Sequence, residues 1–128
     1  MDDIKLEILV RETAELAAEL LQDLMDTPLS EATLIDLTRV IPNFLCEAGL
    51  RWFVELTIKE TNDSFTLKGF HYLGISFSKF FTYMFQELMM RYFDYKATMD
   101  KVNFTSNSIY LEFQPLSKTA LFLKKAGS

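Results

Sequence analysis

The sequence predicts the α+β class, and three observations point to it. Apolar residues recur about every 3.6 positions near the N-terminus and again in an aromatic-rich stretch over residues 70–93, as in amphipathic helices. On either side of that stretch the period falls to two, as in half-buried strands. Turn-forming residues divide the period-two segments into pairs. We therefore expect an N-terminal helical hairpin, two β-hairpins forming a four-stranded antiparallel sheet around a central aromatic-rich helix, and a short C-terminal helix.

At 128 residues the chain is expected to form a single domain, with a helical N-terminal part over 1–48 and a strand-rich core over 50–125. The apolar fraction of 49% excludes a disordered chain. Twelve Phe and six Met residues supply more apolar volume than a small monomer needs, because small domains have little interior. Two explanations carry equal weight: a densely packed core, or an apolar interface with a partner.

Residues 3–26 are predicted to form the first helix. One set of side chains follows alternating steps of four and three, the spacing of a packed seam, and acidic residues occupy the opposite side. The seam residues are Leu6, Val10, Thr13, Ala17, Leu20 and Leu24. Three heptads are few for a coiled coil, so an ordinary helix that covers the core is favoured. Ala14, Ala17 and Ala18 would allow a second helix to approach closely.

A second helix is predicted from Glu31, after a proline-containing turn. Ser30 is its expected N-cap, because a serine hydroxyl accepts hydrogen bonds from the free N–H groups of a first turn. Pro42 lacks the N–H of a helix interior. The helix is therefore expected either to kink there or to end near Val40, with Pro42 opening a short helix to Ala48.

Four segments alternate apolar and polar side chains, as strands do when one face is buried. They are residues 50–59, 65–69, 97–104 and 108–113. Residues 61–64 and the pair Ser106-Asn107 are of types that tolerate tight reversals, so they are the predicted hairpin turns. A short terminal helix over 117–125 completes the expected order of elements.

The central helix is predicted over residues 70–93, which include nine aromatic residues. One broad apolar stripe is expected from Phe70, Leu73, Phe77, Phe81, Met84, Phe85, Leu88 and Tyr92. Tyr72, Tyr83 and Met90 line up on the opposite side, so the helix is expected to contact a partner subunit, a second layer of the fold or a ligand. Gly74 would cost about 1 kcal/mol inside a helix. One explanation for Gly74 is that another helix crosses closely, or an apolar ligand binds, above it. The other is that the helix starts after Gly74.

No set of residues carries a recognisable catalytic, metal or cofactor signature. With one His and one Cys, the usual zinc ligand sets cannot be assembled. His71 has no acidic neighbour to orient it, so a boundary histidine with a hydrogen-bonded ring is favoured over a general base or phosphate acceptor. Cys46 lacks an electropositive setting and is expected to be buried and inert. Glu55 and Glu112 fall on the polar sides of their strands, which predicts solvated carboxylates rather than a catalytic pair.

The net charge of −5 is unevenly distributed. Residues 1–60 hold thirteen acids and five bases, whereas residues 61–128 hold five acids and eight bases. An acidic chain repels phosphate backbones, so nucleic-acid binding is not expected, and the acidic half would suit a basic protein partner. The chain starts with acids where a signal peptide has bases, and no apolar stretch reaches membrane length. The sequence therefore favours a cytoplasmic protein without a membrane span.

The last predicted strand contains residues 107–113 (NSIYLEF) and follows an apolar helix and the first arm of its hairpin. This order of elements resembles the vinyl-reductase-like domains and the subunits of the TRAPP tethering complex. The resemblance covers about residues 50–113. It implies a kind of domain that often dimerises and in some cases holds an apolar ligand or acyl chain. The cysteines frequent in the vinyl-reductase-like domains are absent from this stretch, and the loop before the aromatic helix is very short.

We expect a non-enzymatic protein-interaction module: an adaptor, a chaperone-like subunit or an acidic inhibitor, acting through an aromatic-rich hydrophobic interface in a homodimer or with another protein. The candidate partner-binding residues are Tyr72, Tyr83, Met90, Trp52, Leu20 and Leu24. Phe53 and Tyr110 are further aromatics expected near the surface. The alternative is a small-molecule sensor that holds an apolar ligand between the aromatic helix and the sheet. No cofactor is expected.

Overall fold

The computed structural model of the protein describes residues 3–43, 52–61 and 64–115. Its elements are α1 (Asp3–Asp23), the 3-10 helix η1 (Leu29–Glu31), α2 (Leu34–Pro42), β1 (Glu55–Thr61), β2 (Ser64–Phe70), α3 (Ile75–Phe93), β3 (Tyr95–Phe104) and β4 (Ser108–Pro115). The predicted α+β class is confirmed. The expected C-terminal helix over 117–125, the short helix to Ala48 and Cys46 lie outside the described residues.

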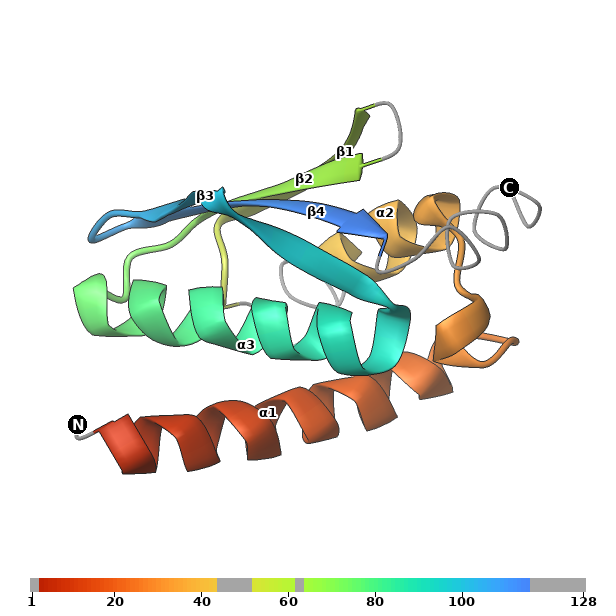
Figure 1. Ribbon diagram of the computed structural model, residues 1–128, viewed down its shortest axis with the longest axis horizontal. Coiled ribbons are helices and arrows are strands. Elements are labelled where there is room, and N and C mark those ends of the chain that lie inside the picture. The colour runs from red at the N-terminus through yellow and green to blue at the C-terminus, as the bar shows by residue number, and fades with distance from the viewer. Residues whose placement is uncertain (1–2, 44–51, 62–63, 116–128) are drawn as a thin grey trace.

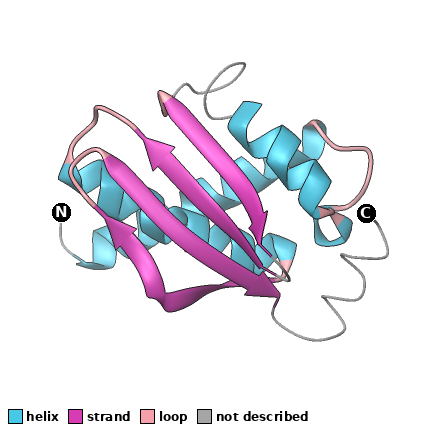
Figure 2. Cartoon of the chain, turned by 90° about the horizontal axis from the view of Figure 1, so that it is seen from above, coloured by secondary structure: helices cyan, strands magenta, loops and turns pink. Residues whose placement is uncertain are grey.

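The sheet has four antiparallel strands, as predicted, and their order is β1-β2-β4-β3. Within each hairpin the two strands pair with each other, β1 with β2 and β3 with β4. The two hairpins are joined by the pairing of β2 with β4. Helices α1 and α3 lie on one side of the sheet (Figure 2). The period-two pattern explains this arrangement: on β2, Phe65 and Leu67 are buried beneath the sheet, whereas Lys68 is exposed on its open face. β1 and β3 are the two edge strands.

Helix α3 forms a middle layer between the sheet and α1 (Figure 1). Phe81, Phe85 and Leu88 are among its fully buried apolar side chains. Helix α1 packs along α3 and buries the small residues Ala14, Ala17 and Ala18, so the close approach predicted for them is present. The chain's own layers thus contact α3 on two sides. An interface with a partner therefore has to use the side chains that these layers leave exposed.

Helix α3 was predicted to begin at Phe70, but it begins at Ile75. Phe70 is the last residue of β2, where the pairing with both neighbouring strands holds the backbone extended. Gly74 is the N-cap of α3, with a φ of 95°, a value that glycine adopts without a Cβ clash. Of the two explanations for Gly74, a helix start after it is therefore correct.

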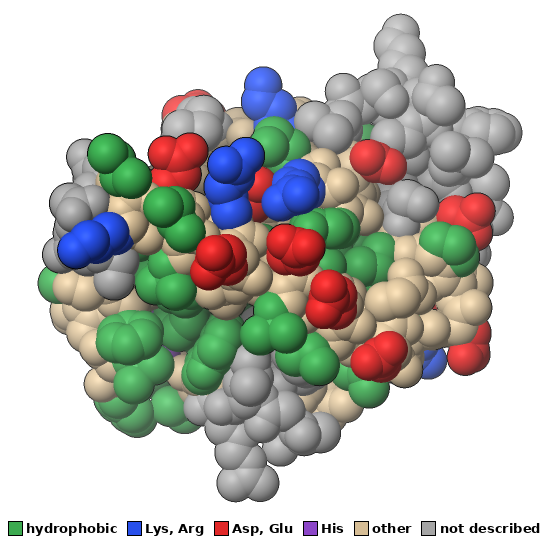
Figure 3. All heavy atoms as spheres, turned by 90° about the horizontal axis from the view of Figure 1, so that it is seen from below, with side chains coloured by type: hydrophobic (Ala, Val, Ile, Leu, Met, Phe, Trp, Pro, Cys, Tyr) green, Lys and Arg blue, Asp and Glu red, His purple; other side chains and the backbone are tan. Residues whose placement is uncertain are grey.

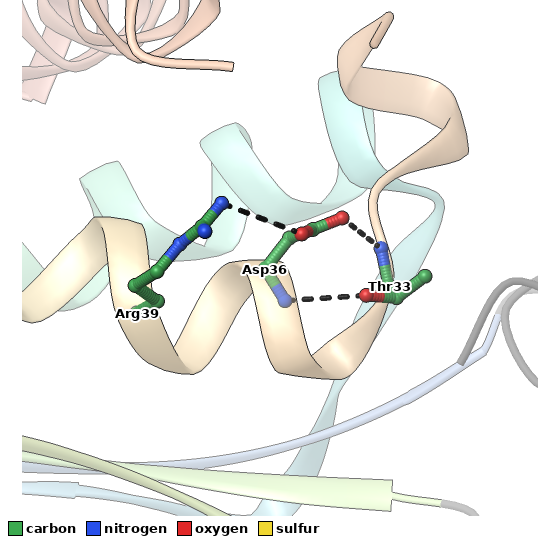
Figure 4. A network of polar contacts seen from close by, with 3 residues as sticks. All are labelled: Thr33, Asp36 and Arg39. Carbon is green, nitrogen blue, oxygen red and sulfur yellow. Dashed lines mark hydrogen bonds and ion pairs between the residues drawn. The ribbon is translucent and has the colours of Figure 1, made fainter. Parts of the chain in front are cut away.

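Helix α2 also begins later than predicted (Figure 4). Ser30 lies in η1, and Thr33 is the N-cap of α2. The Thr33 hydroxyl accepts from the Asp36 N–H at 3.2 Å, and the Asp36 carboxylate accepts from the Thr33 N–H at 3.1 Å. This reciprocal capping box satisfies two backbone donors at once. One turn further on, Arg39 lies 3.6 Å from the Asp36 carboxylate, and the helix ends at Pro42.

The two N-terminal helices differ from the expected hairpin in their packing. Helix α1 packs along α3, whereas α2 packs against β1 (Figure 1). The predicted seam on α1 is only partly right. Leu6, Val10 and Ala17 are buried as expected, but Leu20 and Leu24 are exposed because Ala18 and Leu21 take the inner positions.

Candidate interaction surfaces

The ring of Phe81 is the centre of an aromatic cluster in the first half of α3. Within the described residues, five other rings have centroids between 4.6 and 5.9 Å from that of Phe81. They belong to Trp52, Phe53, His71, Phe77 and Phe80. Tilted and edge-on contacts of this kind are the preferred geometries of aromatic pairs. The cluster joins the segment before β1 and the loop after β2 to α3.

His71 is fully buried, and both of its ring nitrogens have partners. Nδ1 accepts the backbone N–H of Leu73 at 3.0 Å, so the proton of the neutral ring resides on Nε2. Nε2 lies 2.7 Å from Ser78 Oγ and donates to it. Burial lowers the pKa of His71 from its ordinary value of 6.5, because the charged form loses its hydration. The ring is hydrogen-bonded as expected from the sequence, but it is fully buried rather than at the boundary of the core.

Side chains fill the space between α3 and the sheet. The Phe53 centroid lies 4.6 Å from that of Phe81 and 6.0 Å from that of Phe85. Beneath β2 and β4, the rings of Phe65 and Phe113 stack at 5.1 Å. An apolar ligand in this layer would have to separate these rings. The ligand-binding alternative stays a prediction, which native mass spectrometry compared with denaturing spectra would test.

Trp52 and Tyr72, two of the predicted partner-binding residues, lie near the N-terminal end of α3. Trp52 is half-buried, with its ring 5.5 Å from that of Phe81, so it belongs mainly to the core cluster. Tyr72 is 77% exposed and touches only the ring of Phe70, edge-on at 5.3 Å, among the aromatic contacts of the described residues. Phe53, which was also expected near the surface, is instead buried. Tyr72 is therefore open to a partner, as is Phe77 in the first turn of α3.

Tyr83 and Met90 line a shallow groove between α3 and β3, with a volume of about 340 Å³. They are 40% and 46% exposed. The remaining lining residues are Gln86, Glu87, Lys96 and Ala97. Lys79 lies above the Tyr83 ring at 6.0 Å, and Glu87 forms an ion pair with Arg91 at 3.7 Å. The groove thus has an apolar floor between charged rims.

The outer side of α1 carries a strip of leucines. Leu9, Leu16 and Leu20 follow the spacing of one helix face, and Leu24 continues it just beyond the helix. Leu16 is 54% exposed and Leu24 is 50% exposed. A row of exposed acids lies beside this leucine strip: Glu12, Glu15, Glu19 and Asp23. Figure 3 shows acidic side chains in a row on this side of the molecule, with hydrophobic side chains gathered next to them.

The six predicted partner-binding residues therefore fall into three places. Tyr83 and Met90 share the groove, Leu20 and Leu24 share the leucine strip, and Tyr72 and Trp52 belong to the end of α3. Sequence reasoning missed Leu9 and Leu16. Their spacing with Leu20 was a signal for a second apolar strip on α1.

The remaining sequence candidates form no site in the described part of the chain. Glu55 faces Phe70, whereas Glu112 faces Thr66, so the two acids lie on opposite sides of β2 and at different positions along it. Residues 3–43, 52–61 and 64–115 contain no group of three or more His, Cys, Asp or Glu residues that could hold a metal ion. Within these same ranges, no helix has the length and apolar character needed to cross a membrane.

No protein-family model matches the chain, and neither a curated protein nor a solved structure matches it. The resemblance to vinyl-reductase-like domains and TRAPP subunits therefore rests on the order of the elements alone.

Proposed function

We propose that the protein is a non-enzymatic protein-interaction module that binds a basic partner through the outer side of α1. The observation that carries this proposal is the leucine strip beside a row of acids. The inner side of α1 already packs on α3 through its alanines. Leu16 and Leu24 stay about half exposed beside that contact, although the side of a helix that faces water normally presents polar side chains.

The leucine strip would supply the affinity. Full burial of one leucine side chain is worth about 1.5–3 kcal/mol relative to exposure. Leu16 and Leu24, each about half exposed, would both gain part of this free energy when a partner covers them. An apolar strip on a partner helix matches the geometry of this surface, because helix faces present side chains at the same spacing.

The acids beside the strip would select the partner and speed its approach. Glu12, Glu15, Glu19 and Asp23 form a negative row along the helix. Opposite charges steer association and disfavour acidic competitors, and salt screens this steering. We therefore expect a partner whose binding segment combines apolar and basic residues, bound more slowly as the salt concentration rises.

The test is affinity purification from the native host with matched variants. The double variant Leu16→Ser and Leu20→Ser removes the centre of the strip. Val54→Ser is the control, because it removes an exposed apolar side chain next to β1, away from α1. We expect the double variant alone to lose a basic protein that the unaltered chain retains, with an unchanged far-UV circular dichroism spectrum.

Light scattering on the purified protein tests whether the partner is a second copy of the same chain. In that case the mass would rise with concentration, and the double variant would remain a monomer. An identical set of retained proteins and an identical mass for both variants would contradict the proposal.

A further inference from the structure

The end of the molecule at which α1 and α3 begin carries a patch of exposed apolar side chains (Figure 1). Tyr72 and Leu73 lie in the loop after β2, and Ile75 and Phe77 lie in the first turn of α3. All four are between 45% and 77% exposed, and they are called the end patch below. Figure 3 shows hydrophobic side chains gathered at this end of the molecule.

The loop that carries the end patch is fixed by hydrogen bonds of His71. The His71 backbone N–H donates to the Asn107 carbonyl at 2.8 Å, which ties the loop to the turn between β3 and β4. The His71 ring accepts from the Leu73 N–H and donates to Ser78 Oγ, so the start of α3 is held as well. A surface that is ordered before binding loses little conformational entropy when a partner covers it. The end patch is therefore displayed on a fixed backbone.

The apolar area at this end matches what a dimer needs. A fully exposed side chain of this size presents about 200 Å², so the end patch leaves roughly 400 Å² uncovered. Apolar patches of this size on a monomer mark interaction sites. A standard interface buries about 800 Å² per partner, and homodimer interfaces are about 65% apolar, which requires roughly 500 Å² of apolar area. Ile4 and Ile8, exposed near the start of α1 at the same end, supply the remainder.

Charge favours a second copy of the chain as the occupant of the end patch. Residues 70–78 contain no Asp, Glu, Lys or Arg, and His71 is buried with a neutral ring. Electrostatic steering therefore cannot select a different protein at this surface. A two-fold axis places the same surface on both sides of an interface, and an uncharged apolar surface is complementary to itself. The row of acids on α1 is not, because two copies of that row would repel each other.

We infer that the end patch is a homodimer interface, in which the end patches of two copies pack against each other around a two-fold axis. Gly74 lies between the apolar residues, and a Cβ added there would meet no atom within 4 Å. The backbone of the loop is therefore open to close approach by the other copy. This interface is separate from the leucine strip on α1, so each copy keeps its own strip for the basic partner of the proposed function.

Sedimentation equilibrium of the full chain over a range of concentrations measures the association. We expect the mass to rise from 14.9 kDa to twice that value. The double variant Tyr72→Ser with Ile75→Ser should raise the dimer Kd about tenfold or more, because each lost apolar contact occurs twice in a two-fold interface. The matched control Tyr83→Ser with Met90→Ser also removes an exposed tyrosine and an exposed aliphatic side chain, but from α3 outside the end patch. The control should change the Kd by less than about twofold.

Amide hydrogen exchange supplies a second readout, which locates the interface. The N–H groups in the first turn of a helix have no intrahelical acceptor, and the N-cap Gly74 has no side chain to accept from them. The amides of residues 75–77 should therefore exchange rapidly in the dilute monomer and slowly at concentrations at which the dimer forms. Exchange over residues 9–24 should not change. Thermal melting of each variant confirms that it is folded.

Several outcomes would overturn the inference. They are a chain that stays a monomer at every concentration, a dimer that tolerates the loss of Tyr72 and Ile75, and a dimer that is weakened equally in the control. A monomer that co-sediments with phosphatidylcholine vesicles, but not after Tyr72→Ser with Ile75→Ser, would assign the end patch to a lipid surface instead. A dimer lost only in the α1 variant Leu16→Ser with Leu20→Ser would support the proposed function, with a second copy as the partner, while rejecting the end patch.

Discussion

A Cβ atom on Gly69 would lie 2.7 Å from Cε1 of Phe53. Gly69 sits inside β2, where glycine normally weakens a strand. Here its missing side chain makes room for the Phe53 ring, which packs 4.6 Å from Phe81 at the centre of the aromatic cluster. The structure gives it a packing role.

We expect Gly69→Ala to lower the free energy of unfolding by about 1–3 kcal/mol, because the new methyl group displaces a ring in a filled core. Urea unfolding followed by circular dichroism measures the loss. In a Phe53→Leu background, the smaller side chain relieves the clash, so the same substitution should cost clearly less. An equal cost in both backgrounds would show that Phe53 is not the cause.

The buried His71 makes stability depend on pH. Burial places its folded-state pKa below the unfolded value of 6.5, so between these two pKa values the unfolded chain binds more protons. The stability contributed by neutral His71 is therefore fully present above pH 6.5 and is lost as the pH falls through that window. One proton limits the slope to about 1.4 kcal/mol per pH unit.

Urea unfolding between about pH 7.5 and pH 5 measures this slope. His71→Gln removes the titrating group and retains the carboxylates that also titrate in acid. The variant should be less stable at neutral pH, because the Ser78 and Leu73 contacts are lost. Its stability should also change less with pH. Parallel curves for the two proteins would contradict the assignment.

Phe81 and Phe77 form a matched pair, being the same residue type one turn apart on α3. Phe81 is 1% exposed and touches five rings, whereas Phe77 is 47% exposed. Phe81→Ala should cost about 3–5 kcal/mol, the usual loss for a buried phenylalanine. Phe77→Ala should cost much less. Similar shifts of the thermal midpoint would show that the cluster is not centred on Phe81.

The capping box at the start of α2 gives a local prediction. Thr33→Ala removes the hydroxyl that accepts from Asp36 N–H, and the expected cost is about 0.5–2 kcal/mol. Thr33→Ser keeps a hydroxyl and should retain most of the stability. Chemical denaturation of the three proteins compares them. Equal losses for the Ala and Ser variants would mean that the methyl group, and not the cap, stabilises this helix end.

The sheet was predictable because strand periodicity and turn residues are local signals. Residues 65–69 alternate strictly, and β2 extends them by only one residue at each end. The start of α3 was not predictable from spacing alone. Phe70 and Leu73 continue the helical stripe in sequence, yet Phe70 is held in β2 by pairing with the preceding strand β1 and with β4, which lies far away in the chain.

The rotation of α1 also required tertiary information. Its sequence carries two apolar strips, one rich in alanine and one in leucine. The packing of α1 along α3 decides that the alanines face inward and that Leu16 and Leu20 remain exposed. The buried hydroxyls of Ser78 and Thr82 escaped prediction for a similar reason. Their partners, the His71 ring and the Ser78 carbonyl, become visible only in three dimensions.

The pairing of β2 with β4 has a consequence for how the chain folds. Phe70 and Ser108 sit opposite each other, although α3 and β3 occupy the chain between them. Each hairpin can form locally from its own turn. The pairing of β2 with β4, in contrast, closes a long loop of chain at an entropic cost. Pairing of β2 with β4 is therefore expected to be a late, slow step in refolding.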